Sequence, residues 1–199
     1  MVDHLLVARH QDFVCKVVYI VSHIAQDFPP TMATGQRDIM QDVSSSQSRV
    51  ILPLSKPSAP EPADKSVFLA GTTSKRDWRK GLIESIAHLP ITIFNPFRPD
   101  WDSTWREDIS DTRFKEQVEW ELEMQERASI VIVYFEPGTE AHISLLELGL
   151  CARSGKAIVA CPEGYKKRGN VQVVCARFGV PLLESYEDLR DELVRRLEN

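Results

Sequence analysis

The sequence predicts an α/β domain built as a three-layer sandwich, with a mostly parallel sheet of five strands between two layers of helices. From residue 66 onward, short apolar runs alternate with longer segments of helical periodicity. One run, residues 130–135, is almost entirely β-branched or aromatic, which is typical of a strand covered on both faces. Strands that alternate with helices pair in parallel, because each helix returns the chain to the edge where the previous strand began.

The individual elements follow from the same patterns. Strands are expected at residues 67–70, 91–94, 130–135, 157–161 and 180–183. Helices are expected at residues 77–89, 111–127, 144–153, 171–178 and 186–197. Residues 49–54 are compatible with one further strand at the edge of the sheet, the only place where Pro53 is tolerated.

The helix at residues 111–127 carries two apolar stripes. Phe114, Val118 and Leu122 recur every four residues, whereas Trp120 and Met124 lie on a different face. The second stripe is either a subunit interface or a second face in contact with the domain. We expect the protein to form a homo-oligomer.

Composition limits the classes of partner and the type of site. Of the 199 residues, 43% are hydrophobic and 27% are charged, as in ordinary globular proteins. A net charge of −5 without a long basic run argues against nucleic acid as a partner, and no segment is apolar and long enough to cross a membrane. The four cysteines lack metal-ligand spacing, so we expect reduced thiols, no metal and a cytoplasmic location.

Two regions are expected along the chain. Residues 32–65 are rich in Ser, Pro, Gln and Asp, as in a linker or tail. We therefore expect residues 1–48 to form a partly flexible N-terminal extension and residues 49–199 to form the folded domain.

Ligands of parallel α/β proteins bind at the carboxyl ends of the strands, so the loops at that edge are where substrate contacts are expected. The first loop leads into a helix that begins at Asp77, and the second, residues 95–105, is long and combines carboxylates with tryptophans that can stack on a planar base. The alternative is an ordinary turn and tryptophans that pack the loop onto the core. The candidate contacts are Gly71, Thr72, Trp78, Asn95, Arg98, Asp100, Trp101 and Trp105.

Glu147 is the main candidate for chemistry, and it has two interpretations. Ser144-x-x-Glu147 matches a capping box, in which the Glu side chain bonds back to the first amide of its own helix. The alternative is a carboxylate that points into the cleft beside the central strand. Glu136 directly follows that strand, and Asn170 follows the basic segment Lys166–Arg168 near the next strand.

The motifs together resemble the nucleoside 2-deoxyribosyltransferase-like family, over roughly residues 49–185. The resemblance rests on Phe68-Leu69-Ala70-Gly71, Asp77-Trp78-Arg79, Asn95-Pro96-x-Arg98-Pro99-Asp100-Trp101, Gln117-Val118-x-Trp120-Glu121, Ser144-Leu145-Leu146-Glu147-Leu148-Gly149 and Cys161-Pro162-Glu163-Gly164. It implies a flavodoxin-like, Rossmann-like fold that cleaves an N-glycosidic bond by retaining double displacement, without a cofactor. Glu147 matches the nucleophile that attacks the sugar C1′.

The resemblance also implies assisting catalytic residues, and a small-molecule nucleoside or nucleobase as the partner. Glu136 or Asp77 would act as the acid or orient the sugar. The sequence departs from the family where Phe68 stands in place of a Tyr, and where Ser129 and Glu136 stand in place of Asp. The alternatives are a non-catalytic nucleoside-binding or nucleotide-binding module, or a hydrolase of nucleotide monophosphates or NAD-like compounds.

Overall fold

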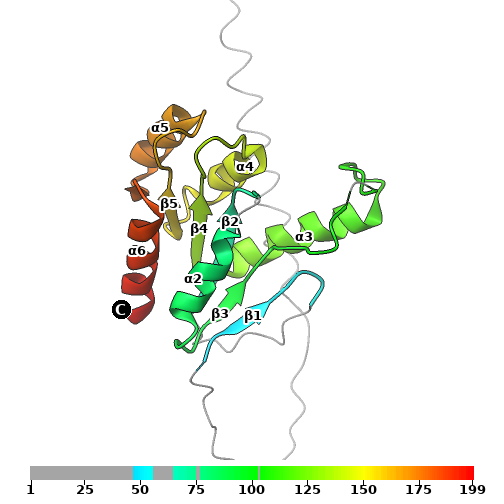
Figure 1. The fold of residues 1–199 in the computed structure, drawn as a ribbon, viewed down its shortest axis with the longest axis horizontal. Coiled ribbons are helices and arrows are strands. Elements are labelled where there is room, and N and C mark those ends of the chain that lie inside the picture. The colour runs from blue at the N-terminus through cyan, green and yellow to red at the C-terminus, as the bar shows by residue number, and fades with distance from the viewer. Residues whose placement is uncertain (1–46, 56–64, 75–76, 103) are drawn as a thin grey trace, which may run out of the picture. The chain divides into compact units, whose positions relative to one another are not determined.

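The computed structural model describes residues 47–55, 65–74, 77–102 and 104–199, so most of the expected extension at residues 1–48 lies outside the described residues. The strands are β1 (Arg49–Ile51), β2 (Ser66–Gly71), β3 (Thr92–Phe94), β4 (Ile130–Tyr134), β5 (Ala157–Ala160) and β6 (Leu182–Leu183). The helices are α2 (Trp78–Ile86), α3 (Thr112–Arg127), α4 (His142–Cys151), α5 (Arg168–Phe178) and α6 (Tyr186–Glu198) (Figure 1). None of these helices combines the length and the apolar character needed to cross a membrane.

The strands form one sheet in the order β1-β3-β2-β4-β5-β6, and every neighbouring pair is parallel. The predicted α/β class is confirmed, but this sheet has six strands rather than five because β1 adds to the edge beside β3. Without β1, the order is that of flavodoxin-like folds, in which the direction of winding reverses between the strands corresponding to β2 and β4. This switch point is where ligands bind in such sheets.

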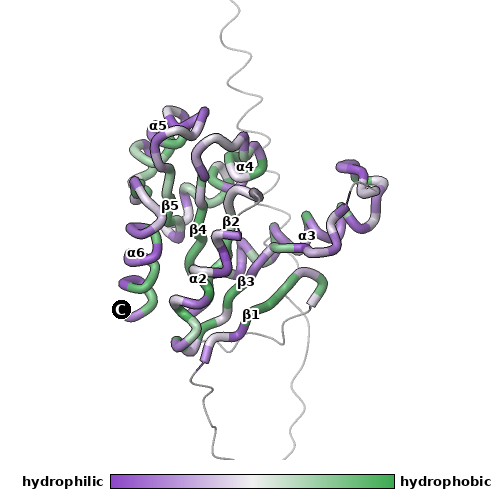
Figure 2. Tube along the Cα trace, in the orientation of Figure 1, coloured by the Kyte–Doolittle hydropathy of each residue, from purple (hydrophilic) through white to green (hydrophobic). Residues whose placement is uncertain are grey.

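Two hydrophobic clusters cover the two faces of the sheet, since successive strand residues point to opposite sides. On β2, Phe68 and Ala70 join the cluster that includes residues of α3, α4 and α5, whereas Val67 and Leu69 join the cluster that includes α2 and α6. Strands β3 and β4 are coloured as hydrophobic in Figure 2, as expected for strands covered on both faces. The predicted three layers are therefore present.

Helix α3 buries the opposite stripe from the one that its four-residue repeat suggests. Trp120 and Met124 lie in the core, and Trp120 packs against Phe68 with ring centroids 6.4 Å apart. Phe114 and Val118 are half-buried, and Leu122 is 43% exposed. Of the two interpretations of the Trp120 stripe, contact with the domain is right and a subunit interface is wrong.

Candidate functional site

Gly71 ends β2 at the switch point and lies very close to β4. Its φ of +136° is a conformation that side chains rarely adopt. A Cβ at this position would lie 2.5 Å from the Tyr134 carbonyl oxygen and 2.7 Å from the Tyr134 nitrogen. Glycine at this position therefore lets the chain turn immediately after β2.

Glu147 is held at this turn and does not cap its own helix. Helix α4 begins at His142 after Ala141, which has a φ of +40°, so Glu147 is the sixth helical residue and lies in the second turn. The capping-box interpretation is wrong, because Ser144 is inside the helix. Instead the Glu147 carboxylate accepts hydrogen bonds from the Gly71 amide and from the buried Ser144 hydroxyl.

Two further ionisable groups surround Glu147. Burial raises the pKa of Glu147 to about 8, the neighbouring Glu121 carboxylate adds to the increase, and Arg79 opposes it. Burial also raises the pKa of Glu121, although a hydrogen bond from Gln117 and the charge of Arg79 favour its ionised form. The charge of one guanidinium, that of Arg79, therefore acts on two carboxyl groups in a site partly removed from water.

Arg79 is unusually deeply buried for an arginine, with a relative exposure of 6%. Its guanidinium donates hydrogen bonds to the carbonyl oxygens of Leu69 at 3.0 Å, Gly71 at 2.8 Å and Thr72 at 3.4 Å. These bonds fix the end of β2 and place a positive charge beneath the turn. Because its donors are occupied by backbone, Arg79 acts on Glu147 through its charge.

The loop after β4 is fastened to the loop after β2. The Glu136 amide donates to the buried Thr72 hydroxyl at 3.1 Å, and the Thr72 and Thr139 hydroxyl oxygens are 3.3 Å apart. The Thr139 hydroxyl also donates to the Glu136 carbonyl at 2.7 Å. Oε2 of Glu136 is buried and has no hydrogen-bond partner within the described part of the chain, so it is available to a ligand.

The long loop between β3 and α3 is organised around Trp105. The ring of Trp105 stacks on Trp101 at 4.6 Å, and the guanidiniums of Arg98 and Arg113 lie 4.9 Å and 5.0 Å from its centre. Trp105 is 8% exposed and Trp101 is 42% exposed. Trp105 therefore fills the loop, and Trp101 is the ring with surface left for a planar ligand.

The remaining polar residues of this loop have partners inside the protein. Arg98 pairs with the exposed Asp100, and this pairing lowers the pKa of Asp100 to about 2. Arg98 also reaches the side chain of Gln117 at 3.4 Å, and the Gln117 amide donates to Glu121 at 2.7 Å. These contacts link the base of the loop to the carboxyl cluster, formed by Glu121 and Glu147. The buried Asn95 accepts a hydrogen bond from the Phe97 amide at 3.2 Å.

Three other predicted residues differ in their surroundings. Trp78 is in the core, where its indole donates to the Thr72 carbonyl at 2.8 Å and its ring packs edge-on against Tyr134. Asp77 is exposed at the N-cap of α2 and interacts electrostatically with Arg79. Asn170 is exposed in the first turn of α5.

The basic segment before Asn170 is largely neutralised. Lys166 pairs with Glu140, and Arg168 pairs with Glu184 while donating to the Cys161 carbonyl at 3.0 Å. These pairings do not favour a phosphate-binding role.

Arg79 and Glu121 are site residues that sequence reasoning did not single out, although both stand in the motifs that carry the resemblance. Arg79 precedes Leu82 by three residues and Ile86 by seven, a spacing that places it on the buried face of α2. That spacing is the feature of the sequence that could have identified Arg79 as buried. Glu121 adjoins the buried Trp120, but no pattern in one sequence shows that it faces Glu147.

Two departures from the family pattern have structural roles. Phe68 is completely buried in the core. The Ser129 hydroxyl donates to the Ser66 carbonyl at 2.7 Å and accepts from the Ser66 amide at 2.8 Å, so it joins the beginnings of β2 and β4. Neither residue brings a polar group to Glu147.

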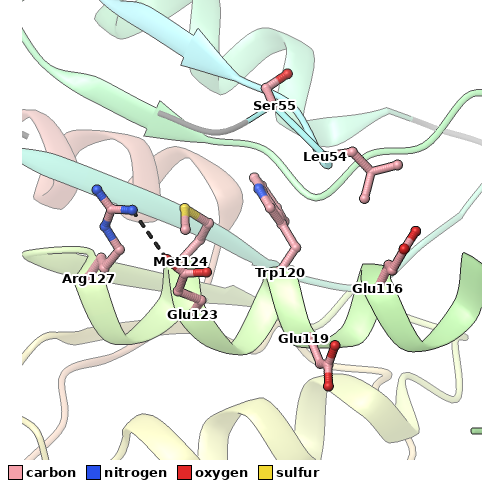
Figure 3. Close-up of a pocket in the computed structure, with 8 residues that line it drawn as sticks. All are labelled: Leu54, Ser55, Glu116, Glu119, Trp120, Glu123, Met124 and Arg127. Carbon is pink, nitrogen blue, oxygen red and sulfur yellow. Dashed lines mark hydrogen bonds and ion pairs between the residues drawn. The ribbon is translucent and has the colours of Figure 1, made fainter. Parts of the chain in front are cut away.

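A separate groove of about 670 Å³ lies between α3 and the turn after β1. Figure 3 shows Trp120 pointing toward Leu54 and Ser55, while Glu119 points away. None of the predicted site residues lines this groove. We place the candidate site at Glu147 instead, because the charged groups and the switch point coincide there.

Comparison with known proteins identifies the family of the chain. The profile of a family described as nucleoside 2-deoxyribosyltransferase like matches residues 64–165, from the start of β2 past the end of β5. The chain belongs to this family. The match includes Arg79, Glu121, Glu136 and Glu147, and the predicted family resemblance is confirmed.

No curated protein matches this member of the nucleoside 2-deoxyribosyltransferase-like family significantly. Among solved structures, it is similar to a conserved protein from Enterococcus faecalis V583, with 16% sequence identity and a TM-score of 0.48. That similarity covers 67% of this chain and 99% of the other.

Proposed function

We propose that this protein cleaves the N-glycosidic bond of nucleosides or deoxynucleosides through a covalent intermediate on Glu147, and transfers the sugar to another base or to water. The observation that carries the proposal is the setting of Glu147. It lies at the switch point, is oriented by the Gly71 amide and the Ser144 hydroxyl, and is accompanied by Glu121 and Arg79. A carboxyl group with a strongly shifted pKa at the switch point of a sheet is a functional-site candidate on physical grounds.

In the first step, a Glu147 carboxylate oxygen attacks C1′ of the sugar and the bond from C1′ to the base nitrogen breaks. The electron pair of that bond leaves with the base, which takes up a proton. The transition state carries positive charge on the sugar, and an anionic carboxylate stabilises it. Arg79 favours the ionised form of Glu147 that makes the attack, because its charge opposes the increase in pKa.

In the second step, a base nitrogen or a water oxygen attacks C1′ and the ester bond to Glu147 breaks. Glu147 leaves as a carboxylate, and the acceptor loses its proton to a nearby base. Two displacements at the same carbon retain its configuration. The partner in both steps is a small-molecule nucleoside or nucleobase.

Glu136 is the proposed contact for the leaving base, because its buried Oε2 lacks a partner among the described residues. Asp77 is the alternative, as an acid or as a group that orients the sugar hydroxyls. We assign the other contacts to the backbone of Gly71, the side chain of Thr72 and the exposed ring of Trp101. Further proposed contacts are Asn95, Arg98, Asp100, Trp105, Ser144 and Asn170. Trp78 is left out, since it is in the core with its indole N–H occupied.

A product assay tests the proposal. Purified protein is incubated with deoxynucleosides, with and without a second free base, and free and exchanged bases are separated by chromatography. Glu147→Ala should reduce base release by at least about 1000-fold, as expected when a nucleophile is removed. Glu84→Gln changes an exposed carboxylate on α2 and should leave the rate unchanged. Base release that survives Glu147→Ala undiminished would show that Glu147 is not the nucleophile.

The same assay separates the competing functions. Exchange of one base for another identifies a transferase, and release that does not depend on the second base identifies a hydrolase. Base binding without release would favour a non-catalytic module.

A further inference from the structure

The carboxyl groups of the candidate site outnumber the cations that act on them. Glu121, Glu136 and Glu147 come from α3, from the loop after β4 and from α4, and none of them forms an ion pair with a described residue. The charge of Arg79 acts on Glu121 and Glu147, but its N–H groups donate to backbone carbonyl oxygens. When its carboxyl groups ionise, the site therefore carries more negative than positive charge.

The surrounding loops do not supply the missing positive charge through three of their basic side chains. Each of these side chains is already paired with a carboxylate of the same chain: Arg98 with Asp100, Lys166 with Glu140, and Arg168 with Glu184. The buried Oε2 of Glu136, in contrast, has no hydrogen-bond partner among the described residues. A buried carboxylate oxygen without a partner is unfavourable, and a positively charged ligand beside it would relieve that cost.

We propose that the substrate of this site is a nucleoside whose base carries a fixed positive charge, as in a pyridinium ring or an N-alkylated purine. This inference rests on the proposed function, because it assigns a substrate class to the same nucleophile, Glu147. The charged ring would contact the Glu136 carboxylate and the exposed ring of Trp101, since the face of a tryptophan attracts a cation as well as a planar ring.

A positively charged base simplifies the first displacement. As an oxygen of Glu147 forms its bond to C1′, the bond from C1′ to the ring nitrogen breaks, and its electron pair cancels the positive charge of the ring. The base leaves as a neutral molecule and takes up no proton, so this step needs no general acid. Such a substrate suits a site in which Phe68 stands in place of the family's Tyr and is buried in the core without a hydroxyl to offer.

The charge of the base would also favour the reactive form of Glu147. Burial and the neighbouring Glu121 raise the pKa of Glu147 to about 8, whereas Arg79 opposes the increase, so Glu147 is largely protonated at neutral pH in the free protein. The thiol of Cys151 is a further titratable neighbour, and burial raises its pKa to about 12, so it stays neutral. A positive charge within about 4–6 Å lowers the pKa of a carboxyl group by about 1–3 units. A cationic substrate would thus generate the carboxylate that attacks it.

Kinetics on a matched pair of substrates tests the preference. Base release from 7-methyl-2′-deoxyguanosine, which is positively charged, and from 2′-deoxyguanosine is measured at pH 7. Each rate is divided by the spontaneous rate in buffer, because the charged substrate is intrinsically more labile. The protein should accelerate release from the charged substrate at least about 10-fold more than release from the neutral one. Equal acceleration of the two, or greater acceleration of the neutral one, would overturn the proposal.

A charge-neutralising variant tests the contact with the base. Glu136→Gln keeps the size of the side chain, and it should lower the ratio of the two accelerations by about 10-fold. Glu84→Gln is the matched control, because it removes an exposed carboxylate of α2, and it should leave the ratio unchanged. A ratio that Glu136→Gln leaves at the wild-type value would overturn the proposed contact.

Equilibrium binding separates failure of this inference from failure of the proposed function. Nicotinamide riboside, which is positively charged, and nicotinic acid riboside, in which a carboxylate cancels that charge, are titrated onto full-length Glu147→Gln protein by calorimetry. Neither compound has to be cleaved, and the charged one should bind at least about 10-fold more tightly. That result would support the charge preference even if the wild-type protein cleaved no nucleoside, which would refute the proposed function alone. Equal affinities, or no binding of either compound, would overturn the charge preference even if neutral deoxynucleosides were cleaved.

Discussion

At the residue scale, the site depends on a glycine as much as on its charged groups. Gly71 supplies the amide that binds Glu147, and it can do so only because no side chain separates it from Tyr134. The buried guanidinium of Arg79 is held by the carbonyl oxygens of the same turn. The positions of the nucleophile and of its counter-charge thus follow from the backbone at the end of β2.

Gly71→Ala should therefore destabilise the protein strongly. The added Cβ would lie 2.5 Å from a backbone oxygen of β4, and the backbone would be strained by its positive φ. We expect the free energy of unfolding to fall by about 3 kcal/mol in chemical denaturation. Gly169→Ala is the control, because a Cβ at that position of α5 meets nothing within 4 Å. Its effect should stay within about 0.5 kcal/mol. Equal stability of the two variants would contradict the close approach of β2 to β4.

At the element scale, the fold was largely accessible from the sequence, and the arrangement around Glu147 was not. Apolar runs such as residues 130–135 identify buried strands because burial on both faces demands them. The start of α4 was misplaced because Ser144 imitates a cap, whereas the helix begins at His142 after a left-handed residue. The two apolar stripes on α3 leave open which face meets the sheet, because a repeat of apolar residues does not show which side is buried.

The part of the site that the sequence does not reveal depends on contacts between residues far apart in the chain. The pairing of Glu121 with Glu147 joins two helices whose relative position depends on the whole sheet. The sequence places Glu147 near the ligand-binding edge but carries no information on its distance from Glu121. Glu136 is predicted from its place directly after the central strand, whereas for Arg79 only the helical spacing indicates a buried position.

The loop between β3 and α3 should depend on Trp105 for its order. Trp105→Ala removes a ring that contacts Trp101, Arg98 and Arg113, and we expect a loss of about 2–4 kcal/mol together with faster cleavage of the loop by trypsin. Trp101→Ala removes a ring that is 42% exposed and should cost less than about 1 kcal/mol. If both variants were cleaved at the wild-type rate, Trp105 would not be the centre of the loop.

At the scale of the whole molecule, the carboxyl cluster should make stability fall as the pH rises. The pKa of Glu147 is raised from 4.5 to about 8 on folding, so the folded state binds this proton more tightly than the unfolded chain. The contribution is fully present below pH 4.5 and is lost as the pH rises to about 8.

Glu147→Gln should remove that dependence. At pH 9 the variant should be more stable than wild type by on the order of 2–3 kcal/mol, and the difference should nearly vanish at pH 4.5. Urea denaturation at both pH values measures it, with Glu84→Gln as an exposed-carboxylate control. A variant that is less stable than wild type at pH 9 would mean that Glu147 is ionised and stabilising in the folded protein.

The central claim, that Glu147 is a nucleophile, is tested most directly by trapping the intermediate. A 2-fluoro-2-deoxy nucleoside slows hydrolysis of the glycosyl ester, because fluorine destabilises the positive charge of the transition state. Intact mass spectrometry should show one added sugar on the wild-type protein and none on Glu147→Gln, and peptide mapping should place the sugar on Glu147. Base release from this substrate without an adduct, or an adduct on Glu147→Gln, would contradict the account.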